Sequence, residues 1–262
     1  MSNLSNDLRV SLVQCEQFWE DKSKNLIHFE SLLNQISDTD LIILPEMFQT
    51  GFSMNVEILA EEMEKSQALT WLKNTAKSKK IAIYTSFIVK EKNQFYNRGI
   101  FVFPEGNYTI YDKRKLFSLA KEDEFFSPGL RQVIVEYKSW KINLQICFDL
   151  RFPELSRNKM NEDGAVDYDL GLFIANWPEK RNHHWKSLLT ARAIENQSFV
   201  VGVNRIGKDG KELIYSGDSR IINPLGETLN SKNAHQEIIQ TILLKKQDLI
   251  DVRNSLNFLK DA

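Results

Sequence analysis

The chain has 262 residues, and its 34 basic and 35 acidic side chains give a formal net charge of −1 at pH 7. This length is sufficient for a sizeable hydrophobic core, and we expect a single domain over residues 1–262. No cluster of basic residues of the nucleic-acid-binding kind is present, so the charge pattern gives no reason to expect DNA or RNA as a partner.

Targeting signals, membrane spans and cysteine usage indicate the cellular compartment. Residues 1–9 contain neither an apolar core nor a cleavage-like site, so we do not expect a signal peptide. No uninterrupted apolar stretch is long enough to span a bilayer, so no membrane association is expected. The two cysteines, Cys15 and Cys147, lie far apart and are expected to be free thiols. Together these features predict a cytoplasmic protein.

Short apolar runs alternate with helical patterns in the first third of the chain. Residues 8–14 alternate and then run apolar, which predicts a strand, and apolar side chains at helical spacing over 22–36 predict an amphipathic helix. The apolar run at 41–44, ended by Pro45, is typical of a buried strand. A second helix is predicted over 67–79 and leads into a strand at 81–89.

The rest of the chain continues the alternation of strands and helices. A hairpin is predicted from strands 96–103 and 108–111, which turn at residues 104–107. Further predicted elements are strands at 133–135, 141–148, 170–175, 199–205 and 237–244, and helices at 184–196 and 247–259. No linker, repeat or low-complexity segment interrupts this order, so the pattern predicts an α/β domain.

Three predicted strands end at residues that can perform chemistry, namely Glu46, Lys113 and Cys147. A carboxylate can accept a thiol proton, an ammonium can stabilise negative charge on a carbonyl oxygen, and a thiolate can attack carbon. Because ligands bind beyond strand ends in α/β sheets, the three residues could converge there. Each residue alone also has a simpler interpretation, as a solvated or salt-bridged charge or as a buried apolar thiol.

The segments around these residues resemble the three catalytic motifs of the nitrilase superfamily, whose members hydrolyse carbon–nitrogen bonds. The matching segments are LPEMF at 44–48, YDKRKLF at 111–117 and ICFDLRFPEL at 146–155. The resemblance continues through NWPEKR at 176–181, HW at 184–185, ARAIENQ at 191–197, YSGDS at 215–219 and NPLGE at 223–227. It implies a four-layer α-β-β-α sandwich, commonly paired into a homodimer.

The resemblance also implies roles for individual residues. Glu46 matches the general base, Lys113 the oxyanion-stabilising lysine and Cys147 the nucleophile. The backbone N–H of Phe148 matches the second oxyanion donor, and Glu122 fits the supporting glutamate that orders the site. The implied reaction passes through a cysteine thioester that water hydrolyses, and it requires neither a metal nor an organic cofactor.

Within the superfamily the chain is most similar to the ω-amidases, through its CFDLRFP segment, its NWPEKR block and its compact length. These enzymes release ammonia from 2-oxo dicarboxylic acid monoamides such as 2-oxoglutaramate and 2-oxosuccinamate. Such a small-molecule substrate carries a carboxylate, so its pocket should offer an arginine. The candidates are Arg151 and Arg181, with Phe48, Phe117 and Trp177 as apolar walls.

Several alternatives stay open. Arg151 could instead form a structural salt bridge with Asp149 or Glu154, and Arg181 could be solvated. The same triad could serve another linear amide, an N-carbamoyl compound or a nitrile. A binding scaffold without turnover is the alternative outside enzymes, although the intact triad argues against it.

Two conspicuous features of the 184–196 helix have structural explanations. His183 and His184 are adjacent, so they face different sides of a helix, and we do not expect a metal site there. Arg192 shares a helical face with apolar residues and should therefore pair with a carboxylate, such as Glu195 or one across a dimer interface.

Overall fold

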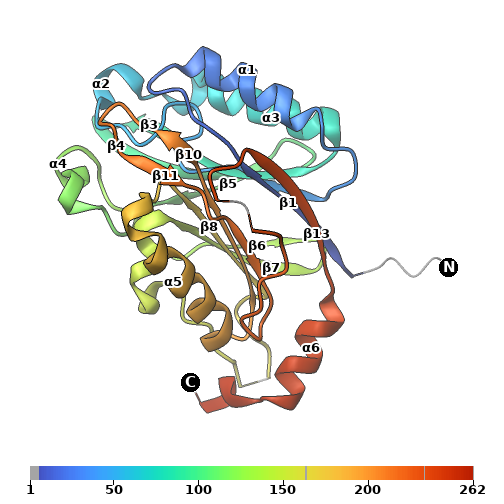
Figure 1. Ribbon diagram of the computed structural model, residues 1–262. Coiled ribbons are helices and arrows are strands. Elements are labelled where there is room, and N and C mark those ends of the chain that lie inside the picture. The colour runs from blue at the N-terminus through green and yellow to red at the C-terminus, as the bar shows by residue number, and fades with distance from the viewer. Residues whose placement is uncertain (1–5, 163, 233, 262) are drawn as a thin grey trace.

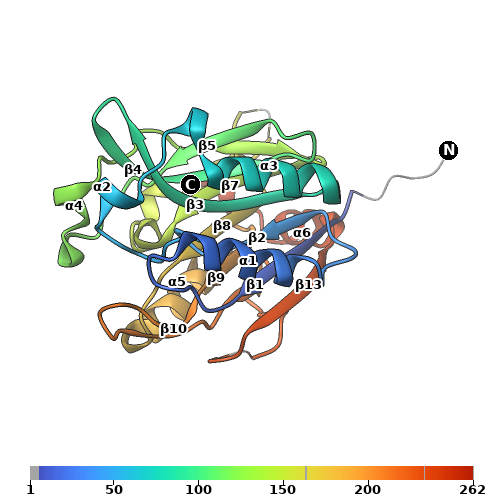
Figure 2. The ribbon, with the colours of Figure 1, turned by 90° about the horizontal axis from the view of Figure 1, so that it is seen from above.

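The computed structural model describes residues 6–162, 164–232 and 234–261 (Figure 1). Two β-sheets lie face to face in the middle, with α1 and α3 on the outer side of one sheet and α5 on the far side of the other (Figures 1 and 2). Helix α6 lies at the end of the second sheet where β8 begins, and its Lys246 and Arg253 pair with Asp169 there. The order of layers is therefore helix, sheet, sheet, helix, as the resemblance implies. Among the described residues, no helix is both long and apolar enough to cross a membrane.

The first sheet has the strand order β13-β1-β2-β3-β4-β5. Strands β1, β2 and β3 run parallel to one another, while β13, β4 and β5 join antiparallel at the two sides. The strand bounds are β1 Leu8–Gln14, β2 Leu41–Ile43, β3 Ala82–Glu91, β4 Gln94–Val102, β5 Tyr108–Asp112 and β13 Ile238–Leu244. The hairpin predicted at residues 104–107 is confirmed as the β4–β5 connection.

The second sheet has the order β12-β9-β8-β7-β6, with a parallel centre formed by β7, β8 and β9. A small separate hairpin, β10–β11, follows β9 and becomes part of the pocket described below. The bounds are β6 Ile134–Tyr137, β7 Trp140–Ile146, β8 Leu170–Ala175, β9 Phe199–Asn204, β10 Ile206–Lys208, β11 Ile214–Ser216 and β12 Arg220–Ile222.

Strand alternation divides the apolar side chains between two clusters. On β2, Leu41 and Ile43 face the core between the two sheets, whereas Ile42 belongs to the cluster beneath α1 and α3. Both faces of this strand are therefore buried, which explains why its sequence is a continuous apolar run.

Local capping fixes the ends of the two helices over the first sheet. The Asp21 side chain accepts the backbone N–H of Lys24 at 3.0 Å, which starts α1, and Ser66 accepts that of Leu69 at 2.9 Å, which starts α3. Lys80 closes α3 in the left-handed conformation. The longer helix bounds are α1 Lys22–Leu33, α3 Gln67–Lys79, α5 Asn182–Glu195 and α6 Lys246–Ser255.

The main elements agree with the sequence-based expectations, and the differences are local. The predicted helix 22–36 ends at Leu33, and the predicted helix 247–259 is split into α6 and a separate 3₁₀ turn, Phe258–Asp261. The short elements α2 (Val56–Leu59), α4 (Glu122–Phe125), β10, β11 and β12 were not predicted, since three or four residues carry too little periodicity. The expected pairing of Arg192 with Glu195 is confirmed at 2.8 Å.

Candidate active site

The three reactive residues that follow strand ends meet where the two sheets face each other. Glu46 follows β2 and Lys113 follows β5 of the first sheet, while Cys147 follows β7 of the second sheet. The side chains of Glu46 and Lys113 have no exposed surface, and Cys147 retains 8% exposure. The structure thus brings together three residues that lie up to about a hundred positions apart in the chain.

A sharp turn presents the cysteine at the end of its strand. Cys147 has a φ of +47°, a backbone conformation that non-glycine residues rarely adopt, and it opens the 3₁₀ segment Cys147–Arg151. The buried carboxylate of Asp149 stabilises this turn, because it accepts the backbone N–H of Ile146 at 3.0 Å and the Tyr111 hydroxyl at 2.7 Å. Phe148, the expected backbone oxyanion donor, directly follows the cysteine within this segment.

The ammonium of Lys113 lies between two buried carboxylates. Its Nζ is 2.9 Å from Oε1 of Glu46, and 3.0 and 2.9 Å from the two oxygens of Glu122. Glu122 also accepts the backbone N–H of Phe117 at 2.6 Å. The neighbouring acidic residues, Asp123 and Glu124, are exposed, so the geometry singles out Glu122 as the carboxylate that contacts the lysine.

These charges set the protonation of the cluster. Burial alone would lower the pKa of Lys113, but the carboxylates of Glu122 and Glu46 raise it above its ordinary value, so the ammonium stays charged. For Glu122, burial raises the pKa, while the Lys113 charge acts in the opposite direction. The site therefore holds a permanent cation beside Cys147.

The thiol itself is held in its protonated form. Burial raises the pKa of Cys147 well above its ordinary value, the nearby Glu46 charge raises it further, and Lys113 partly offsets both effects. Sγ lies 3.9 Å from the backbone carbonyl oxygen of Asn176, which can accept the thiol proton in a hydrogen bond. Attack on carbon therefore requires a base that removes this proton.

Two asparagines fix the orientation of Glu46. Asn97 Nδ2 donates to Oε1 at 2.8 Å, and the backbone N–H of Asn176 donates to Oε2 at 2.8 Å. The sequence interpretation assigned no role to either asparagine. Asn97 lies inside a strand and gives no signal, whereas Asn176 directly follows β8 and shares the strand-end position of the triad.

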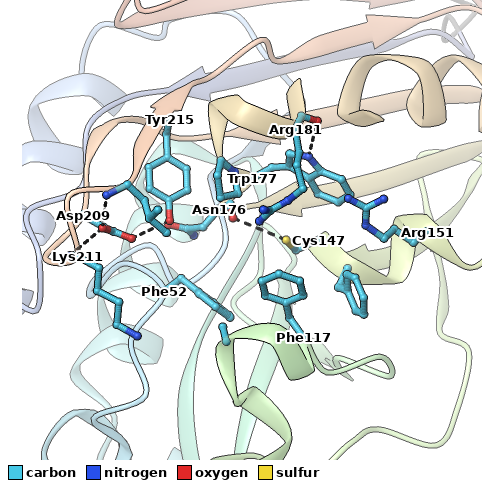
Figure 3. Close-up of a pocket in the computed structure, with 14 residues that line it drawn as sticks. Phe52, Phe117, Cys147, Arg151, Asn176, Trp177, Arg181, Asp209, Lys211 and Tyr215 are labelled. Carbon is cyan, nitrogen blue, oxygen red and sulfur yellow. Dashed lines mark hydrogen bonds between the residues drawn. The ribbon is translucent and has the colours of Figure 1, made fainter. Parts of the chain in front are cut away.

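A pocket opens in front of Cys147, with aromatic side chains around it (Figure 3). Phe117 and Trp177 line it, as expected, and Phe148 contributes its ring as well, 5.0 Å from that of Phe117. Phe52 is an additional wall that the sequence did not indicate, and its ring lies 5.0 Å from the Lys113 ammonium.

The expectation that Phe48 forms a pocket wall is wrong. Phe48 is fully buried in the cluster beneath α1 and α3, where its ring packs against Phe29 at 5.5 Å and Trp71 at 5.7 Å. The backbone turns at Met47, whose φ is +46°, so strand alternation does not continue from Glu46 to Phe48.

Both expected arginines line the pocket. The Arg151 guanidinium stacks over the Trp177 ring at 4.7 Å, and that of Arg181 lies 5.4 Å from the centre of the Phe117 ring. Neither arginine forms an ion pair with a described carboxylate; Arg151 instead contacts Nδ1 of His184 at 3.3 Å. Burial and the like charge of Arg181 both lower the pKa of Arg151, as expected for two neighbouring cations without a counter-ion.

The alternative salt bridge of Arg151 is not formed within the described part of the chain. Asp149 instead accepts hydrogen bonds from Tyr111 and from the backbone N–H groups of Ile146 and Lys115. Arg151 thus lines the pocket without an ion pair to Asp149, and its guanidinium stacks over Trp177.

The opposite side of the pocket comes from the β10–β11 hairpin. The Tyr215 hydroxyl donates to Oδ2 of Asp209 at 2.9 Å, and the backbone N–H of Lys211 donates to Oδ1 at 2.8 Å. The buried Arg205 guanidinium lies 4.9 Å from the centre of the Tyr215 ring. Figure 3 shows Tyr215, Asp209 and Lys211 to the left of Cys147, Arg151 to its right and Arg181 above it.

Comparison with known proteins gives the class to which this site belongs. The profile of the carbon–nitrogen hydrolase family matches residues 9–254. Omega-amidase YafV of Escherichia coli K12 is 43% identical over 229 residues, which cover 87% of this chain and 86% of that protein. The 2-oxoglutaramate amidase of Bacillus subtilis 168 is 34% identical over 257 residues, 96% of each chain.

A solved structure agrees with these relatives. XC1258 from Xanthomonas campestris is a CN-hydrolase superfamily protein with an arsenic adduct in its active site. It superimposes with a TM-score of 0.94 at 39% identity and covers 98% of this chain and 97% of its own. The chain therefore belongs to the carbon–nitrogen hydrolase family, the nitrilase superfamily, and is a hydrolase that acts on amides.

Proposed function

We propose that the protein is an ω-amidase that hydrolyses the terminal amide of 2-oxo dicarboxylic acid monoamides such as 2-oxoglutaramate and 2-oxosuccinamate. The observation that carries this proposal is the pair Arg151 and Arg181, two cations that face one pocket without a described carboxylate partner. Such a pair suits the carboxylate at the far end of the substrate. The names of the YafV and Bacillus subtilis relatives support the same substrate class.

In the proposed acylation step, Glu46 accepts the proton of Cys147 and the thiolate forms a bond to the amide carbon. The carbonyl electrons move onto oxygen, where the Lys113 ammonium and the backbone N–H of Phe148 stabilise the charge. Glu46 then returns the proton to nitrogen, the carbon–nitrogen bond breaks, and ammonia leaves a thioester on Cys147. The hydrogen bonds from Asn97 and Asn176 support this role, because they hold both oxygens of Glu46 in place.

Deacylation uses the same groups with water as the nucleophile. Glu46 removes a proton from water, and the resulting hydroxide attacks the thioester carbon. The carbon–sulfur bond then breaks, the proton returns to Cys147, and the 2-oxo dicarboxylate is released. Lys113 stabilises the second oxyanion as it does the first, which its raised pKa supports, since the ammonium keeps its charge throughout.

A substrate panel tests the proposal. It comprises 2-oxoglutaramate, 2-oxosuccinamate, glutamine, an N-carbamoyl amino acid and a nitrile, with released ammonia as the readout. The expected result is the highest kcat/KM for the 2-oxo acid amides. Highest activity on a compound without a carboxylate would overturn the ω-amidase assignment while leaving the amidase class intact.

We also propose that two copies form a homodimer. The support is three exposed apolar side chains, Ile194 of α5 and Leu225 and Leu229 of the segment that follows β12, which retain 45, 51 and 38% of their surface. Ile194 and Gly226 lie in close contact, so Ile194 and Leu225 belong to one surface. Light scattering after size exclusion should give twice the chain mass, and Ile194→Glu should shift it toward the monomer. A wild-type monomer at micromolar concentration would contradict the proposal.

The proposed location is the cytoplasm. Both cysteines are free, and the proposed nucleophile requires a reduced thiol, which the cytoplasm maintains. Fractionation of the native host with detection of the protein tests this; recovery from an oxidising compartment would contradict it.

A further inference from the structure

One polar atom beside the pocket lacks a partner. Asn176 lines the pocket and is only 4% exposed, and its side-chain Oδ1 accepts no hydrogen bond within the described chain. Its Nδ2 donates to the backbone carbonyl of Glu46 at 2.6 Å. Because a carbonyl oxygen can only accept, this bond fixes which end of the amide is nitrogen and leaves Oδ1 as the unpaired acceptor.

This orphaned acceptor differs from others in the molecule by its position. Several other buried side chains also have an unpaired polar atom. None of those others within the described chain lines the pocket, whereas Asn176 does. An unpaired buried acceptor carries a free-energy cost, because its hydrogen bond to water has not been replaced. A bound substrate that donates a hydrogen bond would remove this cost.

The backbone of the same residue contacts both the expected base and the expected nucleophile. Its N–H donates to Oε2 of Glu46 at 2.8 Å, and its carbonyl oxygen lies 3.9 Å from Sγ of Cys147. Asn176 therefore lies beside both the expected base and the expected nucleophile.

We propose that Oδ1 of Asn176 accepts a hydrogen bond from the amide nitrogen of the substrate and so selects amides over esters. This inference rests on the proposed function. When the substrate carbonyl oxygen faces Lys113 and the Phe148 N–H, the –NH₂ group lies on the other side, near Glu46, and needs acceptors. An N–H held by Asn176 directs the nitrogen lone pair toward the proton on Glu46, which must be transferred before ammonia leaves. An ester has no N–H and gains nothing from this contact.

The test compares an amide with an ester of the same skeleton. For wild type, Asn176→Ala and Asn176→Ser, kcat/KM is measured for 2-oxoglutaramate and for 2-oxoglutarate 5-methyl ester. Both variants should lose roughly 10- to 100-fold more activity on the amide than on the ester, and the loss should lie mainly in kcat. Because both substrates are measured with one preparation, the folded fraction cancels from the ratio.

Asn204→Ala is the matched control. Asn204 is also a buried asparagine beside the site, and its side chain accepts the backbone N–H of Trp177 and donates to the carbonyls of Trp177 and Gly217. It does not line the pocket. Its loss should lower stability and leave the amide-to-ester ratio within about twofold of wild type.

The outcomes separate this inference from the proposed function. Two results would overturn the role of Oδ1. One is an equal loss of kcat/KM on amide and ester in both Asn176 variants. The other is an amide-to-ester ratio that changes as much in Asn204→Ala as in the Asn176 variants. If wild type prefers a different amide, the ω-amidase assignment fails, and the comparison is made with that amide and its methyl ester.

Discussion

The Nζ atom of Lys113 lies 2.9 Å from Oε1 of Glu46, and neither side chain is exposed to solvent. Glu122 contacts the same ammonium at 2.9 Å, so one cation serves two buried carboxylates. Buried charges are tolerated only when they are paired, which makes each member of this cluster depend on the others. The cluster also keeps the ammonium charged beside a thiol that remains protonated.

Removal of the shared cation should therefore damage stability as well as activity. Lys113→Met leaves Glu46 and Glu122 buried without a counter-charge, and we expect the free energy of unfolding to fall by about 3–5 kcal/mol. Ammonia release should become undetectable, because the oxyanion loses its charged donor. Thermal unfolding and an ammonia assay measure the two effects.

Lys121→Met is the matched control, since Lys121 is exposed and its ion-pair partner within the described chain is the exposed Glu124, at 3.3 Å. It should change neither the melting temperature nor turnover measurably. If Lys113→Met and Lys121→Met change the melting temperature and turnover equally, the buried cluster contributes no more than an exposed ion pair.

The two cysteines should respond differently to substitution. Cys147→Ala should lower kcat by at least about 10⁴-fold, because no other group can form the thioester. Cys15→Ala should retain turnover and lose about 1 kcal/mol of stability, because Cys15 is a fully buried apolar side chain. Steady-state kinetics and urea unfolding provide the measurements; similar kinetic losses in both variants would refute the assignment of the nucleophile.

The raised pKa of Cys147 predicts slow alkylation of the free enzyme near pH 7. Only the thiolate reacts with iodoacetamide, and burial raises the pKa of the Cys147 thiol well above its ordinary value, so the rate should still be rising at pH 9. Intact-mass spectrometry follows the modification over time, with denatured protein as the reference. A rate that is already constant between pH 6 and 8 would mean that the thiolate forms without substrate.

The lowered pKa of Asp169 predicts that this residue contributes to the loss of stability in acid. Burial opposes its ionisation, but hydrogen bonds from Lys246 and from the backbone of Lys141, with the charge of Arg253, hold its pKa below the ordinary 3.8. Because the pKa of Asp169 is lower in the folded than in the unfolded state, this group stabilises the fold at pH values above its unfolded-state pKa. That stabilisation is lost as the pH falls through the folded-state pKa. Asp169→Asn should therefore flatten the loss of stability below about pH 4.

The measurement is urea unfolding between pH 2.5 and 7, with exposed Asp123→Asn as the control. The control should follow the wild-type curve. An Asp169→Asn curve parallel to wild type at every pH would show that this carboxylate does not titrate differently in the folded and unfolded states.

The sequence predicted the site where motif and strand end coincide. Glu46, Lys113 and Cys147 each follow an apolar run, and ligands bind beyond strand ends in α/β sheets, so the three residues were expected to converge. The structure brings them together from two different sheets. Arg151 and Arg181 were predicted from the charge of the expected substrate, and both line the pocket.

The sequence placed one residue wrongly and gave no role to others, because their positions depend on backbone geometry that the local hydrophobic pattern does not encode. Phe48 lies two positions after Glu46, but the left-handed turn at Met47 directs it into the core. Asn97 sits within β4 like any polar strand residue, and only the pairing of β4 with its neighbours brings it to Glu46. Tyr215 reaches the pocket through a three-residue strand whose pairing no periodicity reveals.

We expect Arg151 and Arg181 to make the site select amides that carry a distal carboxylate. The most direct measurement is kcat/KM of wild type, Arg151→Ala and Arg181→Ala on 2-oxoglutaramate and on a linear amide of similar length that lacks the carboxylate. Each variant should lose roughly 10- to 100-fold on 2-oxoglutaramate, mainly through a higher KM, and stay within about threefold of wild type on the uncharged amide. Equal effects on both substrates, or none on either, would show that these arginines do not bind the distal carboxylate.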